Sequence, residues 1–368
     1  MPAIMRLLMV SANHFPVMGG VEMHLREVTP RLVAAGVEVE VLTTDRTGRL
    51  PRLEQQDGVL IRRVAAWPRT RDYYIAPGIL RHMAKGSWDI VHVHSYQTAV
   101  PPLAMLGAIR DRVPFVLSFH SGGHASSMRN RLRRPQQMAL RPLVGRARRL
   151  IAVSPFEVRL FARSMKLPLD RFVTIPNGAD MPQPSPGVGP SQESPLILSV
   201  GRLESYKGHQ RAIRAFPHLL SEIPAARLRI VGTGPYAGQL HGLVDDMGLR
   251  AAVTVGSLPP GERQAMADLV ASASLVVLFS EYEANPVAVM EALALRRPVL
   301  AAHTSGLADL ADQGLISTIP LAASPVETAR AMVDAVRRPI ASPPVSLQTW
   351  DSCAADLLAV YRDVLARA

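Results

Sequence analysis

The 368-residue chain contains one cysteine, Cys353, three lysines and only 5% aromatic residues. A single cysteine excludes an internal disulfide and a cysteine-cluster metal site, and it favours a reducing compartment. No apolar stretch reaches the roughly 18–20 uncharged residues of a membrane-spanning helix. The apolar run at residues 1–10 breaks at Asn13-His14 without the small residues of a cleavage site. We therefore expect a strand there rather than a signal peptide, and a cytoplasmic protein.

Several motifs of common enzyme classes are also missing. The sequence has no Asp-x-Asp pair, which is a common carboxylate clamp for a divalent ion, and no His/Asp/Glu trio with zinc-site spacing. It lacks the G-x-G-x-x-G fingerprint of dinucleotide-binding folds and the G-x-S-x-G elbow of one hydrolase class. We therefore predict no metal site and no cofactor.

Positive charge is concentrated in the first half of the chain. The net charge is +11, from 41 Lys and Arg against 30 Asp and Glu. Up to Asp180 there are 26 basic and 13 acidic residues (+13), which leaves 15 against 17 (−2) for the remainder. The two halves are therefore expected to have different partners.

Short β-branched runs alternate with helix-patterned segments along the chain. This alternation predicts an α/β fold with two doubly wound parallel sheets, each covered on both faces. The strands expected in the first half are Arg6–Ala12, Val37–Thr44, Val59–Val64, Asp89–Ser95, Phe115–His120, Arg149–Ser154 and Phe172–Ile175. Those expected in the second half are Leu196–Val200, Arg227–Val231, Val253–Val255, Leu275–Phe279 and Val299–Ala302.

A segment rich in Pro, Gly and Ser, at 181–195, separates the two halves. It predicts a first domain at 1–183, a linker at 184–195 and a second domain at 196–346. A long surface loop within one domain is the alternative. Residues 347–368 carry apolar side chains at helical spacing and are expected to form a closing helix. Two doubly wound domains place a ligand in the cleft at the carboxyl ends of their strands.

The segment 280–294 carries the first candidate site. Asn285 is the expected N-cap of a helix with Pro286 at its first position, so the amides of Val287 and Ala288 can bind a phosphate. The helix is apolar nearly all round, so Glu291 needs a polar partner. Glu283 precedes the helix, and the two carboxylates can hold the hydroxyls of a ribose and a sugar. Alternatively, both are paired to arginines and Asn285 is only a cap.

Arg202 and Lys207 follow a predicted strand in the segment Gly201-Arg-Leu-Glu-Ser-Tyr-Lys-Gly208. A guanidinium and an ammonium near one point can stabilise a diphosphate leaving group without a metal. Two solvated loop charges are the alternative. The loops that end in Gly19-Gly20 and that contain Gly232-Thr-Gly234 are further candidates for a close backbone approach to phosphate.

His120 lies where the strand Phe115–His120 meets the expected cleft. A lone histidine is more often structural than catalytic. His92 and His94 alternate on another strand and are interpreted as mostly structural.

Together these motifs resemble the retaining nucleotide-sugar glycosyltransferases of family 4, which have the GT-B fold of two facing Rossmann-like domains. The resemblance covers nearly the whole chain in the right order. It rests on the Gly-Gly loop, the D-I-V-H-V-H strand, S-F-H, I-P-N-G, G-R-L-x-x-x-K-G, G-x-G-P and E-x₇-E. In this chain Ala284-Asn285-Pro286 replaces the Gly-Phe-Gly of many members, which changes the shape beside the sugar.

The resemblance implies roles for particular residues. Arg202 and Lys207 would bind the donor diphosphate, Glu291 the ribose and Glu283 the hydroxyls of the transferred sugar. His120 would contact the donor sugar near the reacting centre, and the final helix would cross back onto the first domain.

Further donor contacts are expected from backbone. Gly20 and the amides of Val287 and Ala288 would cradle phosphate, and Gly256 and Ser257 are expected near the base. The reaction implied is transfer of a hexose-type sugar from a UDP- or GDP-sugar to a hydroxyl acceptor, with retention and without a metal. No carboxylate is obviously placed as a nucleophile, unlike the paired carboxylates of glycosidases.

The densest charge is at Arg129–Arg149, which contains eight arginines with interleaved apolar residues. One hypothesis is contact with an anionic membrane, on its inner face, or with a lipid-linked acceptor. The other is a solvated helix face or a pocket for a small acidic acceptor. Nucleic acid is not expected, because no aromatic residues accompany the arginines. The functional alternatives are a non-catalytic nucleotide-sugar-binding scaffold and a sugar-nucleotide epimerase on the same fold.

Overall fold

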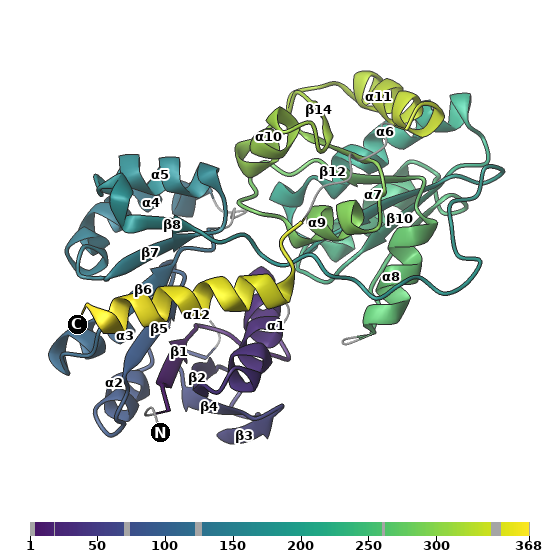
Figure 1. The fold of residues 1–368 in the computed structure, drawn as a ribbon. Helices are drawn as coiled ribbons and strands as arrows, with labels where there is room; N and C mark the ends of the chain where they lie inside the picture. Colours follow the sequence, from purple (N-terminus) through teal and green to yellow (C-terminus); the bar gives the residue numbers. More distant parts are fainter. Residues whose placement is uncertain are drawn as a thin grey trace. The chain divides into compact units, whose positions relative to one another are not determined.

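A computed structural model describes residues 4–17, 19–69, 74–121, 127–259, 262–339 and 347–367. These residues form two compact α/β units, each built on its own sheet (Figure 1). The first unit contains the described residues up to 121 together with 128–178 and 348–367, and the second contains those from 179 to 347. None of the described helices is long and apolar enough to cross a membrane.

The first unit is built on an eight-stranded sheet, as far as the described residues show, in the order β3-β4-β2-β1-β5-β6-β7-β8. Its strands are β1 (Arg6–Val10), β2 (Glu38–Asp45), β3 (Leu53–Gln56), β4 (Val59–Ala65), β5 (Ile90–His94), β6 (Phe115–Ser118), β7 (Arg149–Ala152) and β8 (Phe172–Thr174). Its helices are α1 (Gly20–Ala34), α2 (Gly78–Met83), α3 (Val100–Arg110), α4 (Ser127–Val144), α5 (Pro155–Met165) and α12 (Trp350–Ala366), with a 3-10 turn, η1 (Leu169–Arg171).

The second unit has a sheet of six described strands in the order β11-β10-β9-β12-β13-β14. These strands are β9 (Leu196–Val200), β10 (Arg227–Val231), β11 (Val253–Gly256), β12 (Leu275–Leu278), β13 (Val299–Ala302) and β14 (Ser317–Ile319). The helices are α6 (His209–Glu222), α7 (Ala237–Asp246), α8 (Arg263–Ser272), α9 (Val287–Ala294), α10 (Ser305–Asp312) and α11 (Pro325–Arg337), with a 3-10 turn, η2 (Ser205–Lys207).

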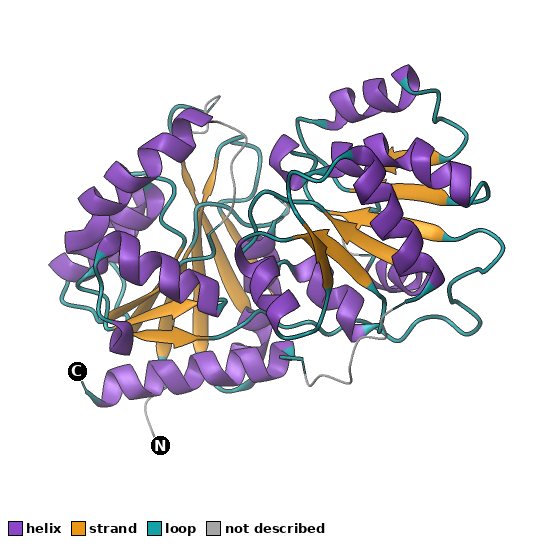
Figure 2. Ribbon diagram, turned by 90° about the horizontal axis from the view of Figure 1, so that it is seen from above, coloured by secondary structure: helices purple, strands orange, loops and turns teal. Residues whose placement is uncertain are grey.

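The expected α/β architecture is confirmed. Helices flank both faces of each sheet (Figure 2), and each unit buries two apolar clusters. The predicted strands all form, and half of them are one or two residues shorter at one or both ends. The strands β3 and β14 were not predicted from the sequence. Both lie at sheet edges and lack a fully buried face, so they carry little apolar alternation.

The strand order reverses between β1 and β5 in the first sheet and between β9 and β12 in the second. In each sheet, successive strands are first added on one side of the first strand, and the later strands are then added on its other side. The loops that follow these strands diverge, and a ligand can enter between them. These two switch points hold most of the candidate residues.

The segment predicted as a linker, 184–195, runs along the second unit, and the change of unit falls before it, between residues 178 and 179. Its hydrogen bonds explain this placement. Ser185 donates its amide and its hydroxyl to the Asp268 carboxylate, both over 2.7 Å. Ser194 donates its hydroxyl to the Ala225 carbonyl over 2.8 Å.

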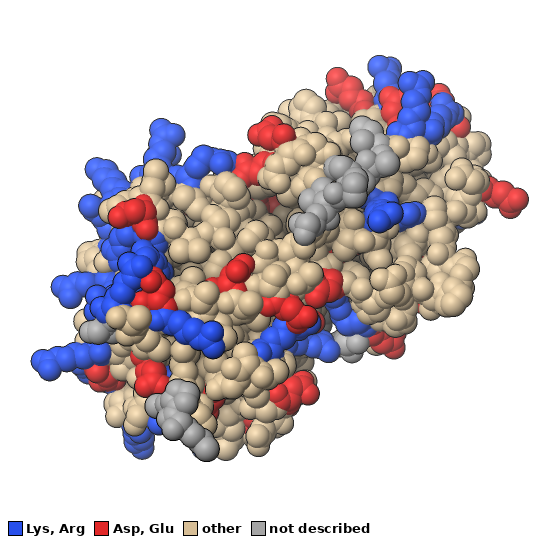
Figure 3. Space-filling view, in the orientation of Figure 1, with Lys and Arg blue, Asp and Glu red and all other residues tan. Residues whose placement is uncertain are grey.

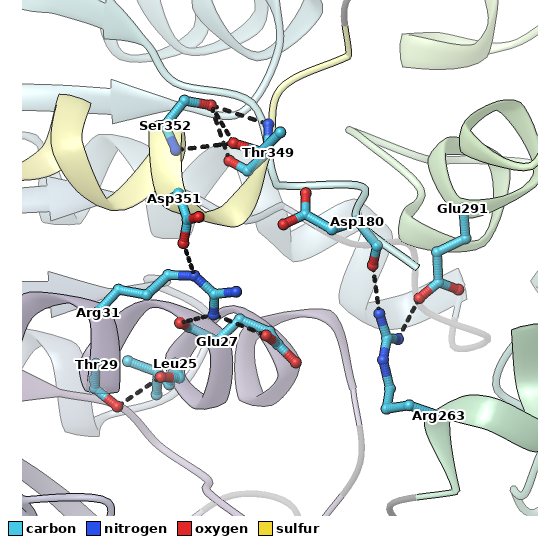
Figure 4. A network of polar contacts seen from close by, with 10 residues as sticks. All are labelled: Leu25, Glu27, Thr29, Arg31, Asp180, Arg263, Glu291, Thr349, Asp351 and Ser352. Atoms are coloured by element: carbon cyan, nitrogen blue, oxygen red, sulfur yellow. Dashed lines mark hydrogen bonds and ion pairs between the residues drawn. The ribbon is translucent and has the colours of Figure 1, made fainter. Parts of the chain in front are cut away.

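The final helix α12 belongs to the first unit and packs against α1. Trp350 is 1% exposed and lies against Gly178, where any side chain would meet its indole ring. Arg31 on α1 donates to Asp351 over 2.6 Å and to Glu27 over 3.0 Å (Figure 4). The end of the chain is thus part of the core of the unit formed by its beginning.

We predict that Trp350→Ala lowers the free energy of unfolding of the first unit by about 3–5 kcal/mol, because it leaves a large cavity between α1 and α12. Denaturant unfolding followed by circular dichroism measures the change. Trp67→Ala is the matched control, since Trp67 is 72% exposed. Equal losses in both variants would contradict this account of α12.

Candidate active site

Two loops meet at the switch point of the second sheet. The first follows β9 and carries Arg202 and Lys207, and the second follows β12 and carries Glu283. Gly208 has a φ of 77°, and a side chain there would collide with the carbonyl oxygen of Phe279. Glycine is therefore required for the two loops to approach this closely. The amide of Glu281 donates to the Tyr206 carbonyl over 2.8 Å and closes the contact.

Lys207 and Glu283 form an ion pair at this junction. The distance from Lys207 Nζ to Glu283 Oε1 is 2.6 Å, and the side chains are 15% and 9% exposed. Ser280 donates its hydroxyl to the same carboxylate oxygen over 2.7 Å, and the Glu283 amide donates to Ser305 Oγ over 2.7 Å. The carboxylate therefore has a fixed orientation, and it holds the ammonium in place.

Arg202 lies beside Lys207 and is joined to it through Tyr206. Arg202 Nη2 donates to the Tyr206 hydroxyl over 2.6 Å, and Lys207 Nζ lies 5.5 Å from the centre of the Tyr206 ring. Burial raises the pKa of the Tyr206 hydroxyl, so it remains a neutral acceptor. The Arg202 side chain is 47% exposed and also pairs with Glu204 over 2.9 Å. A guanidinium and an ammonium are therefore presented together at a strand end.

The buried ring of His209 contacts both β9 and the loop that carries Arg202. Its Nδ1 lies 2.8 Å from Ser199 Oγ and its Nε2 lies 3.2 Å from the Arg202 carbonyl oxygen. Burial lowers the pKa of His209 to about 4, so the ring is neutral at pH 7. It fixes the backbone that carries Arg202 without adding charge.

The glycines of Gly232-Thr-Gly234 have a structural explanation. A side chain at Gly232 would meet the Gly201 carbonyl oxygen, and one at Gly234 would meet the backbone of Leu203. They let the loop after β10 pack against the loop that carries Arg202. In the structure, the backbone at these glycines lies close to the backbone of another loop of the protein. The approach to a phosphate expected from the sequence stays a prediction.

Glu291 is buried on α9 and pairs with Arg263 on α8, with Nη1 2.6 Å from Oε1. The other guanidinium nitrogen donates to the Asp180 carbonyl over 2.7 Å (Figure 4). The sequence indicated that Glu291 needed a partner but not which one. Arg263 lies 28 positions away on a different helix, and no local pattern connects the two.

The start of α9 differs from the expectation. The N-cap is Pro286, and the helix begins at Val287, so Asn285 does not cap it. The extended backbone of Pro286 places it before the first turn rather than in it. Val287 and Ala288 are nevertheless the first two helical residues, whose amides have no intrahelical acceptor. Within the described part of the chain, the buried Oδ1 of Asn285 has no hydrogen-bond partner.

The remaining predicted donor contacts lie apart from these groups in sequence and are exposed. Gly256 ends β11, at the edge of the second sheet, and Ser257 follows it. Gly20 is the first residue of α1 in the first unit, with open space where a side chain would be. Their roles remain predictions.

The switch point of the first sheet gathers four histidines. His92 and His94 are on β5, His120 follows β6, and His24 is on α1. His92 is structural as expected: Nδ1 lies 2.6 Å from the Tyr361 hydroxyl of α12, and Nε2 lies 2.8 Å from Ser118 Oγ. His94 Nδ1 lies 3.2 Å from His120 Nε2.

His120 is held in an unusual backbone conformation, with a φ of 42°. The residue after it, Ser121, donates both its amide and its hydroxyl to the Glu157 carboxylate over 2.5 Å. Ser154 caps the start of α5, because its Oγ accepts a hydrogen bond from the Glu157 amide over 3.4 Å. Glu157 therefore fixes the position of the loop that follows His120. The sequence did not indicate this contact.

Burial keeps the histidines neutral. It lowers the pKa of His24 to about 4, even though the Asn177 side chain raises it in part. Burial also lowers the pKa values of His92, His94 and His120 well below the usual range, and the neighbouring imidazoles lower them further. A cationic role for His120 at neutral pH is therefore not supported.

Two family models cover the chain. Residues 18–182 match Glycosyltransferase Family 4, and residues 184–345 match Glycosyl transferases group 1. A D-inositol 3-phosphate glycosyltransferase of Kineococcus radiotolerans is 30% identical over 78% of this chain and 74% of its own length. D-inositol 3-phosphate glycosyltransferase 1 of Catenulispora acidiphila is 28% identical over 94% and 91%.

Solved structures agree on the fold. Sucrose-phosphate synthase from Thermosynechococcus elongatus has a TM-score of 0.80 at 21% identity, with 99% of this chain and 100% of that chain covered. The Anabaena protein HepE, solved in complex with UDP and glucose, has a TM-score of 0.72 at 18% identity, with 99% and 98% covered. The chain therefore belongs to the family 4 glycosyltransferases with the GT-B fold, and the protein is an enzyme of the hexosyltransferase class.

We predict that acid destabilises the first unit through these histidines. The folded pKa of His24, about 4, lies below the ordinary value of 6.5, so the unfolded chain binds more protons between these two pH values. The contribution of each such histidine to the free energy of unfolding is complete above the unfolded pKa. It falls by about 1.4 kcal/mol per pH unit as the pH drops through this window.

Denaturant unfolding at a series of pH values between about 7.5 and 5 measures this slope. His24→Gln should remove about one proton from the uptake and flatten the curve. His241→Gln, on the exposed side of α7, should leave it unchanged. A wild-type free energy of unfolding that does not change over this range would contradict the burial of neutral histidines.

Proposed function

We propose that the enzyme transfers a hexose-type sugar from a UDP- or GDP-sugar to a hydroxyl acceptor, retains the anomeric configuration and needs no metal. The observation that carries the proposal is the position of Arg202 and the Lys207–Glu283 ion pair at one strand-end junction of the second unit. The HepE structure with UDP and glucose supports a nucleotide-sugar donor on this fold.

The charges at the junction suit a diphosphate leaving group. An ammonium has three N–H donors, and Glu283 accepts one from Lys207, so others can reach phosphate oxygens. Arg202 supplies a second cation whose side chain is half exposed. Fixed donors of this kind stabilise charge that develops on the leaving oxygen, because they need no reorganisation during the reaction.

The carboxylates can contact hydroxyls without repelling the diphosphate. Glu283 is neutralised by Lys207 and Glu291 by Arg263, so neither adds a net negative charge beside the phosphates. Both carboxylates keep further lone pairs that can accept from sugar or ribose hydroxyls. In this proposal Glu283 contacts the transferred sugar, Glu291 the ribose, and the amides of Val287 and Ala288 a phosphate.

His120 is proposed to act in its neutral form. With its pKa well below the usual range, the imidazole can hydrogen-bond a sugar hydroxyl but does not supply a proton from an imidazolium at pH 7. The acceptor proton would then pass to the departing phosphate on the same face of the sugar.

The acceptor is proposed to be an acidic polyol or a lipid-linked group. The names of the relatives, D-inositol 3-phosphate glycosyltransferases, favour a small phosphorylated polyol. The excess basic charge of the first unit suits an acidic acceptor, and Lys and Arg gather on the side where α4 and α5 lie (Figures 1 and 3).

We predict that Lys207→Ala lowers kcat by on the order of 10²–10³ while the protein remains folded, because the variant removes one fixed donor to the leaving group. Initial rates with a UDP- or GDP-sugar measure the effect. Lys85→Ala is the matched control, since Lys85 is exposed in the first unit. Near-normal turnover of Lys207→Ala would refute the role.

The helix α4 is proposed as a peripheral contact with anionic membrane. Arg131, Arg134 and Arg141 are exposed on it, and so are the apolar Leu132 (54%) and Met138 (44%). An amphipathic basic helix of this kind can bind an anionic surface. The start of the predicted segment, Arg129, lies where side chains are not described.

We predict salt-sensitive co-sedimentation with phosphatidylglycerol vesicles, which is lost when the three exposed arginines of α4 are replaced by glutamine. The control is the triple glutamine variant at Arg214, Arg250 and Arg338, which removes the same charge from exposed positions of the second unit. Equal loss in both variants, or no binding by the wild type, would leave α4 as a solvated face.

A further inference from the structure

Three histidines of the first unit lie together although they are far apart in the sequence. His24 comes from α1, His94 from the end of β5 and His120 from the loop after β6. One ring nitrogen from each lies within 4.8 Å of the others. Because all three elements end or begin at the switch point of one sheet, the fold itself brings these side chains together.

Two of these rings have unused nitrogens. In the part of the chain that the structure describes, His24 Nε2 and His94 Nε2 are buried and have no hydrogen-bond partner. A buried polar atom without a partner costs about 1–3 kcal/mol. Such atoms are expected where a ligand supplies the missing interaction.

Neighbouring side chains hold the rings of His24 and His94 in place, as outer partners do for histidines that bind metals. Asn177 Oδ1 lies 3.0 Å from His24 Nδ1 and accepts a hydrogen bond from it, so the proton of His24 is on Nδ1 and its lone pair is on Nε2. His92, which is itself hydrogen-bonded to Tyr361 and Ser118, packs against His94 with the ring centres 3.9 Å apart and the ring planes inclined by 33°. An outer partner that fixes the tautomer and direction of a histidine is characteristic of metal sites.

We propose that His24, His94 and His120 bind a divalent transition-metal ion such as Zn²⁺, one nitrogen each, with a fourth position open to water or to a ligand. Zinc binds histidine nitrogen at about 2.0–2.1 Å, so the three nitrogens would draw together to about 3.4 Å. The neutral state of the three imidazoles is the one that ligation requires.

The chemistry of the ligands selects the ion. Imidazole suits Zn²⁺, Co²⁺, Ni²⁺ and Cu²⁺, whereas Mg²⁺ and Ca²⁺ require oxygen ligands. The predicted diphosphate-binding residues, Arg202 and Lys207, belong to the other unit. If His120 contacts the donor sugar, as the proposed function holds, an ion bound there would inhibit transfer rather than support it.

Titration of the full chain with Co²⁺ tests the site, on protein that carries no polyhistidine tag and has been treated with EDTA. We expect one equivalent of Co²⁺ to bind with the visible spectrum of a four-coordinate ion, and Zn²⁺ to displace it while Mg²⁺ does not. Pulsed electron paramagnetic resonance with Cu²⁺ should count three coordinated imidazoles. No binding, or fewer than three coordinated imidazoles, would overturn the proposal without bearing on the donor site.

Variants separate this site from adventitious surface binding. His24→Ala should weaken Co²⁺ binding at least tenfold, and Asn177→Ala, which removes only the outer partner, should weaken it by about 10–100-fold. His241→Ala is the control, because His241 is exposed on α7, and its Co²⁺ affinity should equal that of the wild type. Unchanged affinity in His24→Ala would place the ion elsewhere and refute the site, and the imidazole count on the wild type decides the case if that variant does not fold.

Discussion

The ion pair between Lys207 and Glu283 is the interaction on which the proposed donor site depends. It joins the loop after β9 to the loop after β12 across the switch point of the second sheet, with a distance of 2.6 Å and little exposure of either side chain. A buried pair of this kind adds little net stability, because desolvation offsets much of its attraction. Its value is positional, since it fixes an ammonium and a carboxylate together at the place where a ligand can enter.

A second ion pair balances the other carboxylate of the proposed site. Arg263 pairs with Glu291 as Lys207 pairs with Glu283, so each of the two buried carboxylates has its own cation. A site that binds a diphosphate can keep carboxylates for sugar hydroxyls only if their charge is balanced in this way. The first unit is organised differently at its own switch point, where neutral histidines are packed against α1 and α12 and burial rather than pairing sets their state.

The sequence predicted what depends on short-range pattern. Buried strands, the helices that alternate with them and the segments carrying Lys207 and Glu283 follow from apolar spacing and from residues close to strand ends. Contacts that depend on tertiary packing could not be predicted in this way. Arg263 reaches Glu291 from another helix, His24 meets His94 and His120 over more than sixty positions, and Glu157 fastens the loop behind His120. The start of α9 differed by one residue, because Pro286 has an extended backbone and precedes the first turn instead of starting it.

The most direct test of the central claim is calorimetric titration of UDP and of GDP into the protein in EDTA, and again with Mg²⁺. The account predicts that at least one of the two nucleotides binds in EDTA, with an affinity that Mg²⁺ leaves essentially unchanged, because Arg202 and Lys207 supply the positive charge. Binding that appears only when Mg²⁺ is added, or no binding of either nucleotide, would contradict it.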